Sequence, residues 1–117
     1  MRYVKVARLA DVPEDRALRV DLEGRPVALV RVGERIHAVD DTCTHEKASL
    51  SDGWVEDTEI ECPHHGACFD VVTGEAVTLP ATEPLRTHDV RIVGEDVLVM
   101  AVEEEKETRD VQRAASD

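Results

Sequence analysis

The segment from residue 43 to residue 65 reads CTHEKASLSDGWVEDTEIECPHH and carries a cysteine and a histidine at each of its ends. One residue separates Cys43 from His45, two separate Cys62 from His65, and sixteen lie between the two pairs. Side chains this close along a short loop converge on one small volume. A ligand set that is already assembled also lowers the ordering cost of binding a metal. The segment therefore predicts a metal site with four ligands.

The residues around the second pair support a binding loop. Pro63 stiffens the chain, and Gly66 permits the positive φ or close backbone approach that wrapping a metal requires. The ligand types alone are compatible with two kinds of metal centre, a zinc site and a two-iron cluster. Two cysteines and two histidines can form a tetrahedral zinc site, but zinc fingers keep the cysteines together and the histidines together. Here each loop has one cysteine and one histidine, and the loops lie among strands. This arrangement suits a two-iron cluster with both cysteines on one iron and both histidines on the other.

Short runs of alternating apolar and polar residues dominate the rest of the chain, and no helical period is convincing between residues 16 and 102. Turns are expected at Glu23-Gly24, Gly33-Glu34 and Gly94-Glu95, because glycine permits hairpin turns. The strand-like runs are 3–9, three within 17–39, 58–62, 67–72 and a hairpin within 88–102. Many short strands joined by glycine turns predict an all-β chain, an antiparallel sandwich or barrel.

The net charge of -12 is unevenly distributed. Residues 40–78 contain ten acids and one base, residues 1–39 and 79–102 are together neutral, and residues 103–117 are acidic. We therefore expect a base built from 1–40 and 81–102, an inserted metal-binding subdomain at 41–80, and a tail at 103–117 that is disordered or a short helix. An acidic chain is a poor nucleic-acid binder and favours a partner with a basic docking patch.

Length and composition limit the class of protein. A chain of 117 residues makes one domain, and it lacks a run of about 20 apolar residues that would span a membrane. Its N-terminus has no apolar signal core, so we expect a soluble, cytoplasmic protein. Three cysteines are a poor basis for a disulfide framework. Close Cys and His residues in a reducing compartment point to metal instead.

The pattern C-T-H, sixteen residues, C-P-H-H-G resembles the Rieske family. The resemblance extends over residues 3 to 102, because RPVALVRVGERIHAVDDTCTH is similar to the family's strands before the first loop. The segment TGEAVTLPATEPLRTHDVRIVGEDVLV is similar to its return through a proline-containing loop. The resemblance implies the Rieske fold, an antiparallel base with a small inserted cluster-binding subdomain. It also implies one [2Fe–2S] cluster per chain, with the ligands Cys43, His45, Cys62 and His65.

The resemblance also bears on the potential. Histidine ligation leaves the oxidised cluster neutral, which raises its potential into a span of roughly -150 to +300 mV. High-potential respiratory members carry a serine and a tyrosine where this chain has Ala67 and Phe69. They also carry a disulfide between the positions of Ala48 and His64. This chain lacks those hydroxyls and that disulfide, and residues 40–78 are acidic. We therefore expect a reduction potential at the low end of that span.

A small, low-potential carrier resembles the ferredoxins of bacterial aromatic-ring-hydroxylating dioxygenases. The resemblance implies a flavin-dependent reductase as donor, a terminal Rieske oxygenase as acceptor, a carrier rather than a catalyst, and a monomer. The residues 79–84, LPATEP, would shield the third side of the cluster. Alternatives are the small subunit of nitrite reductase and a Rieske protein of iron–sulfur assembly. A redox sensor and a structural zinc domain are alternatives of another class.

Several residues near the motif receive ordinary structural roles. His64 is expected to be an exposed neighbour of the cluster, and Cys68 a free thiol. His37 and His88 are expected on strands as surface or packing residues. Trp54 is expected to pack the connection between the two loops, and Phe69 to lie in the core beneath the cluster.

Overall fold

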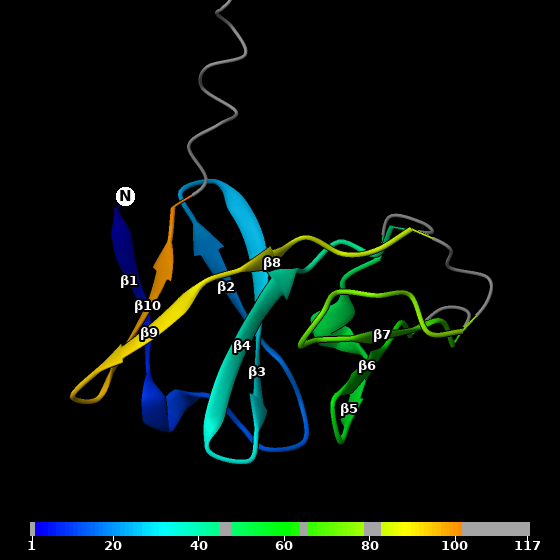
Figure 1. Cartoon of the computed structure of the whole chain (residues 1–117), viewed down its shortest axis with the longest axis horizontal. Helices are drawn as coiled ribbons and strands as arrows, with labels where there is room; N and C mark the ends of the chain where they lie inside the picture. Colours follow the sequence, from blue (N-terminus) through cyan, green and yellow to red (C-terminus); the bar gives the residue numbers. More distant parts are fainter. Residues whose placement is uncertain (1, 45–47, 64–65, 79–82, 102–117) are drawn as a thin grey trace, which may run out of the picture.

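The computed structural model describes residues 2–44, 48–63, 66–78 and 83–101, and nearly all regular structure within them is β (Figure 1). Three antiparallel sheets account for the strands. The first has the order β1-β10-β9, with the bounds Tyr3–Arg8, Asp96–Met100 and Val90–Val93. The second has the order β2-β3-β4-β8, with Leu18–Leu22, Arg25–Val32, Arg35–Asp40 and Thr87–His88. The third has the order β5-β6-β7, with Trp54–Glu56, Glu59–Glu61 and Cys68–Asp70.

The predicted all-β, antiparallel fold is confirmed, as are the three expected turns. Gly24, Gly33 and Gly94 adopt φ values of 96°, 61° and 60°, a region that glycine enters without strain. The segment LADVPEDR, residues 9–16, is expected to form one short turn, and the 3₁₀ helix η1 (Leu9–Asp11) lies there. Three other short elements were not predicted, because none is long enough to show a period: β5, β8 and the 3₁₀ helix η2 (Leu50–Asp52). No helix of the described residues has the length and apolarity of a membrane span.

Strand β3 lies in the middle of the molecule and is buried on both faces. Val27 and Leu29 pack into a core shared with Val97 and Val99 of β10, between the first and second sheets. The intervening Ala28 and Val30 point the opposite way, because successive side chains of a strand alternate between faces. They join a second core with the third sheet and η2, made of Ala28, Val30, Val39, Cys43, Ala48, Leu50, Ile60, Cys62, Ala67, Phe69, Val71 and Leu85.

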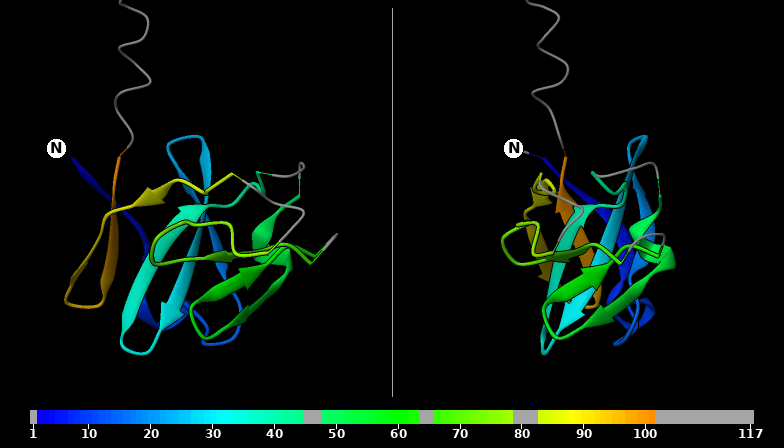
Figure 2. Two further views of the ribbon diagram at one scale, coloured as in Figure 1. Left: turned by 45° about the vertical axis from the view of Figure 1, so that its right-hand side comes forward. Right: turned by 90° about the vertical axis from the view of Figure 1, so that its right-hand side faces the viewer.

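The three sheets therefore form successive layers, with β2-β3-β4-β8 between the other two (Figures 1 and 2). The second core lies directly below two loops that leave β4 and β6. Phe69, which is completely buried there, confirms its predicted place in the core. The first and last residues of both loops, Cys43, Ala48, Cys62 and Ala67, thus lie in one shared apolar core.

Candidate metal centre

The two loops that carry the cysteines are closed in the same way. The backbone N–H of Cys43 donates to the carbonyl of Ala48 at 2.9 Å, and that of Cys62 donates to the carbonyl of Ala67 at 2.7 Å. Each cysteine thus begins a tight loop that returns to its start after five residues. We call these the first loop (residues 43–48) and the second loop (residues 62–67).

Both cysteines lie where a metal could use them. Cys43 is 3% exposed and Cys62 is 1% exposed, and both side chains lie within the same apolar core. His45 and His65, like His64, lie outside the described residues, so their role as ligands stays a prediction. Within the described part of the chain, no three Cys, His, Asp or Glu side chains gather as a metal site. The structure thus places the two sulfur donors and leaves the nitrogen donors to the sequence.

Gly66, near the end of the second loop, has the positive φ that the sequence allowed for. Its φ is +73°, and its N–H donates to the carbonyl of Cys62 at 3.1 Å. A side chain there would meet the carboxylate of Glu61 at 3.2 Å. Any residue with a Cβ would be strained at this φ, so glycine is what allows the loop to close.

Gly53 brings the two loops together, a role that was not predicted from the sequence. A Cβ at this position would lie 1.8 Å from the carbonyl oxygen of Glu61 and 3.3 Å from Cδ of Pro63. The backbone that follows η2 therefore rests directly on the start of the second loop. The motif Ser51-Asp52-Gly53 gives a turn signal, but no sequence pattern shows which strand a glycine will contact.

A third segment reaches the first loop. Thr44 donates its hydroxyl to the carbonyl of Glu83 at 2.8 Å. Leu85 N–H donates to the carbonyl of Gly74 at 2.7 Å, which fixes the same segment against the turn after β7. Pro84 lies between these two anchors, whereas residues 79–82 lie outside the described residues. The C-terminal end of the LPATEP segment is therefore beside the first loop, which fits its predicted shielding role.

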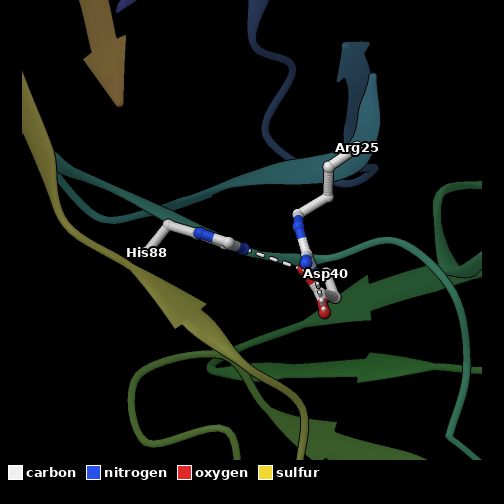
Figure 3. A network of polar contacts seen from close by, with 3 residues as sticks. All are labelled: Arg25, Asp40 and His88. Atoms are coloured by element: carbon white, nitrogen blue, oxygen red, sulfur yellow. Dashed lines mark hydrogen bonds and ion pairs between the residues drawn. The ribbon is translucent and has the colours of Figure 1, made fainter. Parts of the chain in front are cut away.

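A polar network fixes β4 to β8 just before the first loop (Figure 3). Asp40 accepts a hydrogen bond from Nε2 of His88 at 2.8 Å and pairs with Arg25 at 3.1 Å. Burial alone would raise the pKa of Asp40, but the His88 hydrogen bond and the Arg25 charge outweigh it and lower that pKa. The His88 side chain is 2% exposed, so it is a buried member of this network. The sequence had suggested only a surface or packing role.

The outer face of the third sheet is acidic. The register pairs Trp54 with Glu61 and Glu56 with Glu59, which places all four side chains on one face. Within the described residues, none of the three glutamates has an ion-pair partner. Cys68 lies beside Glu61 on β7. Burial, followed by the charges of these glutamates, raises the pKa of its thiol despite a hydrogen bond with Thr78.

The expected packing role of Trp54 is wrong. Its side chain is 62% exposed on β5, with the Arg16 guanidinium 5.7 Å from its ring centre. The adjacent Val55 faces the core instead. A short strand with alternating faces can expose an aromatic residue as easily as bury it, and β5 was not among the predicted strands.

The donor set fits an iron–sulfur group better than a reactive or disulfide pair. Two buried thiols open two closed loops in one apolar core, and no hydroxyl accompanies them at Ala67 or Phe69, both completely buried. Soft thiolates paired with imidazoles are typical ligands of such clusters. The arrangement can therefore hold a redox group.

Comparison with known proteins agrees with this chemistry. A family model described as the Rieske [2Fe-2S] domain matches residues 2–89. The chain is 43% identical over 100 residues, 85% of its length and 93% of the relative's, to the 3-phenylpropionate/cinnamic acid dioxygenase ferredoxin subunit of Escherichia coli (strain K12). It also resembles the ferredoxin of carbazole 1,9a-dioxygenase from Nocardioides aromaticivorans IC177. The TM-score is 0.83 and the identity 35%, over 87% of this chain and all of that one.

A further solved structure contains two proteins of one such system. It is described as a complex of reduced oxygenase and oxidized ferredoxin in carbazole 1,9a-dioxygenase. The match has a TM-score of 0.78 and 40% identity, over 83% of this chain and 91% of that one. That description names an oxygenase as the partner of a ferredoxin with this fold.

Proposed function

Because this chain belongs to the Rieske [2Fe-2S] domain family, we propose that it serves a multicomponent aromatic-ring-hydroxylating dioxygenase, receiving electrons from a flavin-dependent reductase and delivering them to the terminal oxygenase. The chain is a one-electron carrier with a Rieske cluster, and not itself the catalyst. The observation that carries the proposal is the pair of buried cysteines at the start of two loops that are closed in the same way.

We assign the cluster to Cys43, His45, Cys62 and His65. When bound, it supplies a reversible one-electron couple. The loops contribute burial of the thiols, and the Thr44–Glu83 and Gly53–Glu61 contacts hold the loops against their neighbours. Residues 41–80 form the proposed cluster-binding subdomain, residues 1–40 and 81–102 the base, and residues 103–117 an acidic tail.

The acidic outer face of the third sheet is the proposed docking surface. Trp54 offers a large exposed apolar side chain, and Glu56, Glu59 and Glu61 surround it with negative charge. Glu61 directly precedes Cys62, so this surface lies against the second loop. Exposed tryptophans are frequent energetic centres of protein interfaces, and charge complementarity accelerates encounter. A partner with basic residues around an apolar pocket would fit it.

The proposed potential lies at the low end of the range for histidine-ligated clusters, about -150 to 0 mV. Two observations support it. Ala67 and Phe69 are buried without hydroxyls that could stabilise the reduced state, and the surrounding surface is acidic. We also propose that the protein is a cytoplasmic monomer, the simplest state for a carrier that shuttles between two partners.

The experiment is a redox titration of the purified holoprotein, followed by electron paramagnetic resonance of the reduced state. We expect two irons and two sulfides per chain and a Rieske-type spectrum. Stopped-flow mixing with a flavin-dependent ferredoxin reductase and then with a terminal ring-hydroxylating oxygenase should show one electron accepted and one delivered. A colourless protein that retains zinc would refute the cluster. Transfer to a nitrite reductase subunit but to no oxygenase would refute the assigned partner.

Replacement of one nitrogen donor tests the ligand set. His65→Cys should retain a cluster with lower potential, because an added thiolate makes the oxidised site more negative. His37→Cys is the matched control, since His37 lies on β4 and outside the motif. A midpoint of the His65 variant that equals the wild-type midpoint would remove His65 from the ligand set.

A further inference from the structure

Asp41 is a buried charged residue two positions before Cys43, and the carrier function described above gives it no role. It is 1% exposed, whereas every other Asp and Glu of the described residues is at least partly exposed. Two residues of chain span at most about 7 Å, so its carboxylate lies close to the start of the first loop. An unmatched buried charge is costly to fold, which makes its surroundings informative.

The contacts of Asp41 hold the segment that follows the first loop. Its carboxylate accepts hydrogen bonds from the backbone N–H of Ser51 at 2.9 Å and from the hydroxyl of Ser49. Its backbone carbonyl accepts from the N–H of Leu50 at 2.7 Å, and its N–H donates to Pro26 of β3 at 3.1 Å. One residue therefore connects the central sheet to the chain on the far side of the loop.

The charge of Asp41 is only weakly balanced. Nε of Arg19 lies 3.8 Å from the carboxylate, and the Arg19 side chain is 59% exposed. Ser49 and Ser51 supply neutral donors. Because charges away from water interact more strongly than charges at the surface, this negative charge acts on its neighbourhood more than the exposed acids do.

We propose that Asp41 is a positioning residue with two effects: it anchors the first loop, and its buried charge lowers the reduction potential of the group held by that loop. The second effect rests on the proposed function, and the first does not. A nearby fixed negative charge disfavours the arrival of an electron. The acidic surface was expected to contribute, and this buried carboxylate adds to it a charge that is shielded from water.

Asp41→Asn separates charge from shape, because the amide keeps an oxygen for the N–H of Ser51. We expect its midpoint potential to rise, with reduction favoured by about tenfold, or 59 mV for a one-electron couple. Asp52→Asn is the matched control, since Asp52 is an exposed acid in the adjacent helix η2. Its shift should be several times smaller. Equal shifts in the two variants would overturn the charge effect.

Ser49→Ala separates anchoring from charge. It removes one hydrogen bond to the carboxylate but leaves the negative charge in place. We expect faster loss of iron on heating and a lower unfolding temperature, also for the metal-free chain, without a positive shift in potential. Iron retention and an unfolding temperature like those of the wild type would overturn the anchoring role. Ala10→Ser, an exposed change on η1, checks that the assay reports local effects.

Arg19→Gln keeps the proposal testable if Asp41→Asn does not fold. Removing the nearest base from an exposed position should leave the buried charge less balanced and shift the midpoint to more negative values. The shift should exceed that of Arg35→Gln, an exposed base in the β3–β4 hairpin. Equal shifts would contradict the charge effect. A wild-type protein without a two-iron cluster would instead refute the proposed function. The unfolding temperature of Ser49→Ala would still test whether Asp41 anchors the first loop.

Discussion

At the scale of single residues, the hydrogen-bond donors around the sulfurs determine what the site can do. Ala67 closes the second loop through its carbonyl and is completely buried, so a hydroxyl placed there would lie away from solvent at the end of that loop. Phe69 is completely buried two residues further along, on β7. Neither residue offers a proton to a reduced, more negative group.

Ala67→Ser should therefore raise the midpoint potential. A net hydrogen bond of about 1 kcal/mol in favour of the reduced state corresponds to roughly 40 mV in a one-electron couple. Redox titration of the holoprotein measures the shift, with Ala10→Ser as a control far from the loops. If both serine variants keep the wild-type midpoint, the missing hydroxyl does not explain a low potential.

Single residues also show where the sequence was sufficient and where it was not. For Gly66 the sequence suggested a positive φ or a close backbone approach, and the structure shows the positive φ. Asp41 looks identical to Asp40 in the sequence, yet one carboxylate is buried and the other is only half-buried. Burial of a polar residue depends on long-range neighbours such as Ser49 and Pro26, which no local pattern reveals.

At the scale of elements, the contact between η2 and β6 decides how the two loops meet. The alternation of apolar and polar residues predicted most of the strands, because most of them have a buried face and the turns between them contain glycine. It did not predict β5 or β8, whose two or three residues are ordered by pairing with neighbours and not by their own pattern. The exposure of Trp54 was missed for the same reason, because Trp54 lies on β5.

Gly53→Ala should disrupt that contact. The new Cβ would lie 1.8 Å from the carbonyl oxygen of Glu61, so η2 or β6 must shift, at a cost of about 1–3 kcal/mol or more. Urea unfolding measures the loss. Gly33→Ala is the control, because its φ of +61° is strained but nothing lies near its Cβ. The Gly53 variant should lose more stability and also lose iron faster; equal losses would argue against the contact.

The Asp40 network should make β4–β8 pairing sensitive to acid. The pKa of Asp40 is lowered in the folded state, so its contribution to stability is present above the ordinary carboxyl pKa. It is lost as pH falls through the lowered value. Asp40→Asn should cost about 1–3 kcal/mol at pH 7 and flatten the acid limb of the stability curve. Urea unfolding from pH 7 to pH 3 measures this.

The matched control for that change is Asp15→Asn, which removes an exposed carboxylate. Its stability should follow the wild-type curve over the same range. An Asp40 variant whose stability falls with acid as steeply as the wild type would show that the network does not contribute to acid unfolding.

At the scale of the whole molecule, the distribution of charge matters more than its sum. Most Lys and Arg side chains of the described residues lie on the first and second sheets. The third sheet, which is nearest the second loop, presents three glutamates and one tryptophan. Charge counting along the sequence predicted this asymmetry, because residues 40–78 contain ten acids and only one base. Which side chains share a face needed the strand register.

Electron transfer to a partner should therefore slow as salt rises, since exposed charges are screened within about 8 Å at physiological ionic strength. Glu56→Gln together with Glu59→Gln should lower the association rate at low salt and weaken its salt dependence. Trp54→Ala should raise the dissociation rate instead. Stopped-flow rates measure both, with Glu34→Gln, on the β3–β4 turn, as the control. Rates independent of salt would contradict electrostatic docking.

The two-sided burial of β3 has a consequence for anyone who wishes to transplant or delete the proposed cluster-binding subdomain, residues 41–80. Its removal would expose Ala28, Val30 and Val39 and leave the second sheet with a bare aliphatic face. The isolated segment would lose the apolar surface against which Leu50 and Phe69 pack. Minimal peptide mimics of the cluster loops should aggregate unless a substitute for that surface is engineered into them.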